Sequence, residues 1–124
     1  MKVTFLGVGE AFDNDYTHTC ILVEAAGRRM LVDCGATAPP SVWHQSKRPD
    51  YLDGIFISHF HADHVFGLPA LMKRMEEDGR TRPFYLFGPV GSQRNVERLM
   101  EFAYPGMVAS LTFTLRFREL QRSH

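Results

Sequence analysis

The feature that most limits how this chain can fold is a short stretch dense in ionisable side chains, SHFHADH at residues 58–64. The apolar run GIFI at 54–57 comes directly before it, and GLP at 67–69 opens a helical pattern directly after it. The pattern predicts a turn that joins a buried strand to a helix. The end of a buried strand is a rigid place to hold side chains for binding or catalysis.

Three imidazoles and one carboxylate lie in this turn, on His59, His61, Asp63 and His64. Imidazole and carboxylate are ligands that Zn²⁺ takes, and the same donors suit Mn²⁺ or Fe. His59 and His61 can reach one ion, whereas Asp63 and His64 come one turn later and can reach a second. The alternative is that these are ordinary core or solvent-exposed side chains. That alternative leaves unexplained why three of the chain's 6 histidines lie together.

Size and charge narrow the possible classes of protein. The chain has 124 residues, which is one domain at most or part of one. Its 14 basic and 14 acidic residues cancel, so no global positive field attracts nucleic acid, although a local basic patch stays possible. No apolar run reaches the length of a membrane span, and the N-terminus does not have the shape of a signal peptide. We therefore expect no membrane association and a cytoplasmic location, with Cys20 and Cys34 as reduced thiols in the core.

Hydrophobic periodicity predicts a mixed β-sheet with helices on one face, which is an α/β class of fold. Apolar or alternating runs predict strands at 2–6, 18–25, 29–33, 54–57, 84–87 and 111–117. Helical spacing of apolar residues predicts helices at 39–45, about 66–77 and 92–103, the last with Ser92 as its N-cap.

The HxHxDH string resembles the signature of the metallo-β-lactamase fold. The longer run LDGIFISHFHADHVFGLP at 52–69 resembles the ribonuclease Z branch in particular, and FLGVG at 5–9, LVDCG at 31–35 and FYLFGP at 84–89 are similar to its strands. The resemblance covers nearly the whole chain but only about the N-terminal half of the family's domain. It implies that residues 1–124 form a single half-domain, half of an αβ/βα sandwich.

The resemblance also implies a role for each residue of the turn. His59 and His61 would hold a first zinc ion, and Asp63 and His64 a second, with Mn²⁺ or Fe as other possible metals. Asp63 would in addition take the proton from the attacking water, which makes it the catalytic residue. Asp33 would support the metal site by orienting a ligating histidine. An Asx-turn or helix cap at the end of a strand is an equally good interpretation of Asp33.

Two features indicate that the sheet and the metal site both need a further part to be complete. Several strands are apolar on consecutive residues, which predicts cover on both faces of the sheet, whereas these helices can cover only one. The family's remaining metal ligands lie beyond this stretch, and the only later histidine is His124. We therefore expect either a homodimer that pairs sheet to sheet or a missing C-terminal half. His18 is expected to be a rim or strand histidine rather than a ligand.

The functional hypothesis is a zinc-dependent hydrolase, most similar to a ribonuclease Z-type phosphodiesterase, whose site is completed by a second half or a second copy. Its substrate would be a phosphodiester or another small molecule, and RNA is possible. An alternative is a non-catalytic metal-binding half-domain, or a truncated fragment that only assembles. A thioesterase or lactam hydrolase is a further alternative, because a fold does not determine its substrate.

Overall fold

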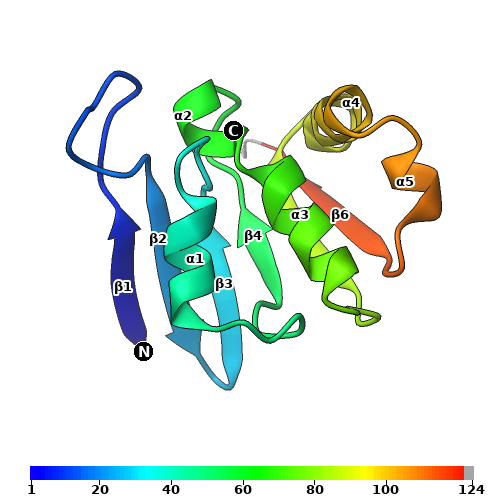
Figure 1. The fold of residues 1–124 in the computed structure, drawn as a ribbon, viewed down its shortest axis with the longest axis horizontal. Helices are drawn as coiled ribbons and strands as arrows, with labels where there is room; N and C mark the ends of the chain where they lie inside the picture. The colour runs from blue at the N-terminus through cyan, green and yellow to red at the C-terminus, as the bar shows by residue number, and fades with distance from the viewer. Residues whose placement is uncertain (122–124) are drawn as a thin grey trace.

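The computed structural model describes residues 1–121, so His124 lies outside the described part of the chain. One sheet of six strands forms its centre, in the order β1-β2-β3-β4-β5-β6 (Figure 1). The first three strands are antiparallel, and β3 to β6 are parallel. The strands are β1 Lys2–Gly7, β2 Cys20–Ala25, β3 Arg28–Val32, β4 Gly54–Phe56, β5 Phe84–Pro89 and β6 Leu115–Leu120. The helices are α1 Pro39–Gln45, α2 Ala62–Val65, α3 Leu68–Glu77, α4 Ser92–Ala103 and α5 Met107–Ser110.

Helices cover one face of this sheet. Figure 1 shows α1 and α3 in front of the strands, and α4 packs against α3, β5 and β6. On that face Leu22, Leu31, Ile55 and Leu86 lie in register across four neighbouring strands, and each is at most 1% exposed. The expected mixed sheet with helices on one face is confirmed.

The opposite face of the sheet is uncovered within residues 1–121 and is apolar over β1 to β5, whereas β6 places Arg116 and Arg118 beside Tyr85 and Phe87. Val3, Phe5 and Phe56 are 44%, 66% and 39% exposed, which is high for large apolar side chains in strands. We call this surface the open sheet face. Its residues are Val3, Phe5, Ile21, Val23, Met30, Val32, Phe56, Tyr85 and Phe87. A continuous apolar surface of this kind is typical of an interface with another layer of protein.

The start of α4 differs from the sequence-based prediction. Gly91, with a φ of 95°, occupies the N-cap position, and Ser92 is the first helical residue. The Ser92 hydroxyl donates to the Pro89 carbonyl instead of capping the helix. The Glu119 carboxylate accepts the N–H groups of Gly91 and Gln93, and these two hydrogen bonds lower the pKa of Glu119 from its usual value. A side chain from β6 therefore replaces the local cap.

The last predicted strand was wrong in its first half. The alternation over 111–117 predicted a strand, but β6 begins only at Leu115 and is preceded by the short helix α5. Phe113 is 5% exposed because it fills the core from an irregular segment rather than from a strand. Alternating burial in this segment thus arises from core packing and does not require strand pairing.

Two further expectations can be compared with the structure. Cys20 and Cys34 are free and fully buried, as predicted. A hydrogen bond with Cys20, together with burial, raises the pKa of the Cys34 thiol well above its usual value. Across residues 1–121 the helices are all too short or too polar to cross a lipid bilayer.

Candidate metal centre

The parallel strands β3 and β4 end side by side and bring two segments of the chain together (Figure 1). Asp33 follows β3 directly, and the turn at 58–64 follows β4. The second half of this turn is helical, because Asp63 and His64 belong to the one-turn helix α2 and His61 is its N-cap residue in an extended conformation. The carboxyl ends of parallel strands are the usual place for ligand sites in α/β sheets.

Backbone contacts fasten the turn to the segment after β3. The Cys34 N–H donates to the His64 carbonyl at 2.7 Å, and the Gly67 N–H donates to the Cys34 carbonyl at 3.0 Å. A Cβ atom at Gly67 would lie 2.3 Å from the Gly35 carbonyl oxygen, so a side chain cannot fit there. A Cβ atom at Gly35 would likewise lie 2.2 Å from the Asp63 carbonyl oxygen. Glycine at 35 and 67 therefore allows the two backbones to approach closely enough for these hydrogen bonds.

The buried carboxylate of Asp33 organises the start of the turn. Its Oδ1 accepts the Ser58 N–H at 2.8 Å, and its Oδ2 accepts the Ser58 hydroxyl at 2.6 Å. The same Oδ2 lies 2.7 Å from Nδ1 of His64. Asp33 itself has a φ of 61°, a left-handed conformation that aspartate and asparagine tolerate better than most residues. One carboxylate thus connects the two ends of the turn.

These contacts determine which nitrogen of each neutral imidazole carries the proton. Asp33 Oδ2 can only accept, so Nδ1 of His64 must be the donor. The Ser58 hydroxyl gives its proton to Asp33, so its oxygen accepts from Nδ1 of His59 at 2.9 Å. In both histidines the lone pair is then on Nε2, which is the arrangement of a histidine that binds a metal while its other nitrogen is held by a carboxylate or hydroxyl.

The three imidazole rings lie close to one another. The centroid of the His59 ring is 3.9 Å from that of His64 and 4.7 Å from that of His61, which stands nearly edge-on at 80°. His61 is exposed to solvent, and His59 and His64 are half-buried. Within residues 1–121, however, no group of three or more His, Cys, Asp or Glu side chains is arranged to hold a metal ion.

The contact between Asp63 and His64 tests whether these residues fit a divalent ion. Asp63 Oδ2 lies 3.3 Å from Nε2 of His64, the nitrogen that carries the lone pair when the ring is neutral. Two acceptors then face each other, and a cation or a proton between them would stabilise the pair. The imidazole nitrogens of His59 and His61 are also ligand atoms that divalent ions take. The chemical types of these side chains therefore suit a divalent ion.

The structure therefore brings together most of the residues singled out from the sequence. Asp33, His59, Asp63 and His64 are connected by hydrogen bonds or direct contacts. The His61 ring makes a T-shaped contact with His59, and the His61 carbonyl accepts the His64 N–H at 2.9 Å. The sequence analysis missed Ser58, which links Asp33 to His59. A hydroxyl residue at the end of a buried strand, directly before the first histidine, was the signal that could have identified it.

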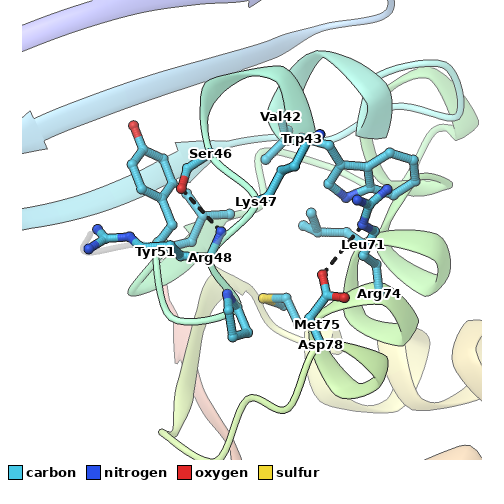
Figure 2. A pocket seen from close by; sticks show the side chains of 12 residues that line it. Val42, Trp43, Ser46, Lys47, Arg48, Tyr51, Leu71, Arg74, Met75 and Asp78 are labelled. Carbon is cyan, nitrogen blue, oxygen red and sulfur yellow. Dashed lines mark hydrogen bonds and ion pairs between the residues drawn. The ribbon is translucent and has the colours of Figure 1, made fainter.

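A small, partly open cavity lies elsewhere and does not belong to this centre. It has a volume of about 20 Å³ and is lined by α1, the loop after it and α3, with Val42, Leu71 and Met75 among its walls (Figure 2). The loop at 46–52 leads into the start of β4, whereas the turn follows its end, so the cavity lies at the opposite end of the strands from the turn. Its volume allows one water molecule but no substrate.

Known proteins are similar to this chain in sequence. The sequence model of the family described as "Anti-Pycsar protein Apyc1" matches residues 1–97. A ribonuclease Z of Methanococcus maripaludis is 35% identical over 105 residues, which are 84% of this chain and 34% of that protein. A ribonuclease Z of Bacillus cereus is 32% identical over 121 residues, covering 90% of this chain and 39% of that protein. The chain thus spans about a third of the length of the curated relatives that it matches.

Solved structures of related proteins have a similar fold. The short form of human tRNase Z (ELAC1) superimposes with a TM-score of 0.81 at 30% identity, over 99% of this chain and 47% of that one. The metallo-β-lactamase fold protein YhfI of Bacillus subtilis superimposes with a TM-score of 0.73 at 18% identity, over 98% of this chain and 46% of that one, which supports the fold alone. The chain therefore belongs to the family described as Anti-Pycsar protein Apyc1, and its fold is the N-terminal half of a ribonuclease Z-like metallo-β-lactamase domain.

Proposed function

We propose that this chain supplies the metal-binding half of a metal-dependent phosphodiesterase. The observation that carries this proposal is the buried Asp33 carboxylate, which holds His64 directly and His59 through Ser58 so that both present Nε2. A structural histidine cluster has no need of this arrangement, whereas a histidine that binds a metal does. The relatives named ribonuclease Z support phosphodiesters, including those of RNA, as the substrate class.

Each residue has a proposed role. His59, His61, Asp63 and His64 would hold one or two divalent ions, with zinc as the first choice and Mn²⁺ or Fe as alternatives. A bound ion would supply Lewis-acid polarisation of a phosphoryl oxygen and would lower the pKa of a water ligand. Asp63 Oδ2 would take a proton from the attacking water, since this carboxylate is half-buried within the group. Asp33 would keep the Nδ1 proton on His64.

A specific observation favours a second candidate, a half-domain that binds metal without catalysis. No three ligand side chains of residues 1–121 converge on one point. A hydrolytic zinc site needs about three protein ligands and an open position for water. On this alternative the turn would bind an ion weakly and would have no hydrolytic activity of its own.

Hydrolysis of a bis-aryl phosphodiester in the presence of Zn²⁺ or Mn²⁺ tests the proposed activity. We expect His61→Ala to reduce the rate by at least about tenfold, because it removes a ligand of the reacting centre. His44→Ala is the matched control, since His44 is an exposed histidine on α1 far from the turn. Equal rates for wild type and His61→Ala would mean that the turn is not the catalyst. No activity, with one weakly bound ion per chain, would support the second candidate.

We also propose that the open sheet face is covered by a second β-layer. The matched relatives and neighbouring structures are longer chains, so the layer can come from the rest of such a chain, or from a second copy of this one in a homodimer. For the chain alone we expect a dimer at micromolar concentration, because its large apolar side chains would otherwise stay in water.

Light scattering coupled to size-exclusion chromatography measures this association. Val23→Lys places a charge on the open sheet face and should give a monomer. Gln93→Lys is the matched control, because it places the same charge on the exposed side of α4 and should leave the dimer intact. A wild-type chain that is folded and monomeric at micromolar concentration would contradict the homodimer.

A further inference from the structure

His18 is a buried histidine that the proposed chemistry does not use. It is 8% exposed and lies just before β2, where it forms an isolated bridge with Gly9. Its carbonyl oxygen packs so closely on Gly7 that a Cβ atom there would lie 1.9 Å away. The His18 backbone is thus packed tightly against β1, so the fold sets its position.

A pair of reciprocal hydrogen bonds joins His18 to Thr37. The His18 N–H donates to the Thr37 hydroxyl oxygen at 2.9 Å, and the Thr37 N–H donates to Nδ1 of His18 at 3.4 Å. Thr37 lies in the segment that follows β3 and leads into α1, 19 residues away along the chain. The pair therefore fastens two segments that are distant in sequence, and it requires an acceptor at the Nδ1 position.

The same side chain packs against the backbone of the metal turn through Gly35. A Cβ atom at Gly35 would lie 2.3 Å from Cβ of His18 and 2.2 Å from the carbonyl oxygen of Asp63. The His18 side chain and the Asp63 carbonyl thus both pack on the side of Gly35 where a side chain would otherwise stand. In the same segment, Asp33 holds His64 by its carboxylate and Cys34 holds it by its N–H group.

We propose that His18 is a positioning residue for the metal centre, which acts with Thr37 to hold segment 33–37 against the turn. This inference rests on the proposed metal site. If the hydrogen bonds with Thr37 are lost, segment 33–37 gains freedom. The Asp33 carboxylate and the Asp63 backbone then no longer have fixed places relative to His64, and the ligands lose part of their orientation before any ion binds.

Two measurements on the full chain test this role, amide hydrogen exchange without metal and calorimetric titration with Zn²⁺. His18→Leu removes the acceptor at nearly constant volume. We expect the Cys34 and Gly67 amides to exchange about tenfold faster, as for the loss of roughly one hydrogen bond. The Zn²⁺ dissociation constant should rise by about tenfold, the lower end of the effect seen for residues that orient metal ligands. His18→Asn should restore both values, because the asparagine Oδ1 can accept at the position of Nδ1.

Thr37→Val serves as a second variant in case His18→Leu does not fold. It removes the hydroxyl acceptor but keeps the His18 side chain, so exchange should become faster by a smaller factor. Unchanged exchange and affinity in His18→Leu would overturn the proposal. Weaker Zn²⁺ binding with unchanged exchange would also overturn it, because His18 would then contact the ion itself. If the wild type binds no Zn²⁺, the proposed function fails, and exchange in the metal-free protein still decides whether His18 holds segment 33–37.

Discussion

Replacing Arg80 with methionine is expected to lower the free energy of unfolding by about 3–5 kcal/mol, because four partly or fully buried backbone carbonyl groups lose a charged donor. The Arg80 side chain is 1% exposed. Its guanidinium donates to the carbonyl oxygens of Pro49, Leu52, Arg82 and Pro83 at distances from 2.7 to 3.0 Å. These acceptors lie on the loop before β4 and the loop before β5, so one side chain fastens the entry to both strands.

The surroundings of Arg80 explain why lysine should not replace it. Its guanidinium carbon lies 5.1 Å from the ring centroid of Phe84 and 5.5 Å from that of Phe113, where a planar cation is well accommodated. Burial, and next the nearby charge of Arg82, lower the pKa of Arg80 to about 10, so the group is still charged at neutral pH. A lysine has three donors on one atom and so cannot donate to all four carbonyl oxygens at once.

Urea denaturation followed by circular dichroism measures the effect of Arg80→Met. Arg94→Met is the matched control, since Arg94 is exposed on α4, and it should change the free energy of unfolding by less than about 0.5 kcal/mol. Arg80→Lys should be destabilised to an intermediate degree. A loss below about 1 kcal/mol in Arg80→Met would mean that the freed carbonyls find water, and the assigned role of Arg80 would be wrong.

Replacing Asp33 with asparagine is expected to weaken Zn²⁺ binding by about 10–100-fold while the chain still folds. Asparagine tolerates the left-handed backbone at this position, where φ is 61°, and its Oδ1 can still accept the Ser58 N–H. Its amide nitrogen cannot accept from His64, however, and donates to Nδ1 instead. The proton of a neutral His64 then moves to Nε2, which removes the lone pair that a metal needs.

Calorimetric titration with Zn²⁺ compares Asp33→Asn with Asp50→Asn, which makes the same change at an exposed carboxylate before β4. The control should bind as the wild type does. Nitrogen chemical shifts of the His64 ring report the tautomer independently of metal. If Asp33→Asn kept both the wild-type affinity and the Nε2 lone pair on His64, Asp33 would have only a structural role at the end of β3.

The sequence predicted this fold well where local patterns and long-range packing agree. GIFI followed by SHFHADH and GLP predicted strand, turn and helix, and β4, the turn and α3 have this order. The helices α2 and α5 were not predicted, because four residues are too few to produce a helical period. The strand at 111–117 was misplaced because Phe113 is buried from a loop, and burial alone does not distinguish a loop residue from a strand residue.

The contacts that organise the candidate site were harder to predict. The sequence left two equally good roles for Asp33, support of the metal site and a local turn or cap. Its partners Ser58 and His64 are 25 and 31 residues away along the chain, so no local pattern could decide between these roles. Arg80 gave no signal, because arginine is ordinarily a surface residue and its buried partners are backbone carbonyls, which every sequence has. The reciprocal pair between His18 and Thr37 depends in the same way on the folded backbone.

The metal content of the chain tests the central claim most directly. After equilibrium dialysis against micromolar Zn²⁺, elemental mass spectrometry gives the number of zinc ions per chain. The wild type is compared with the double variant His59→Ala, His61→Ala. We expect about one or two ions on the wild type, as the four donors allow, and clearly fewer on the double variant. A wild type that retains no zinc, or a double variant that retains as much as the wild type, would contradict a metal centre at this turn.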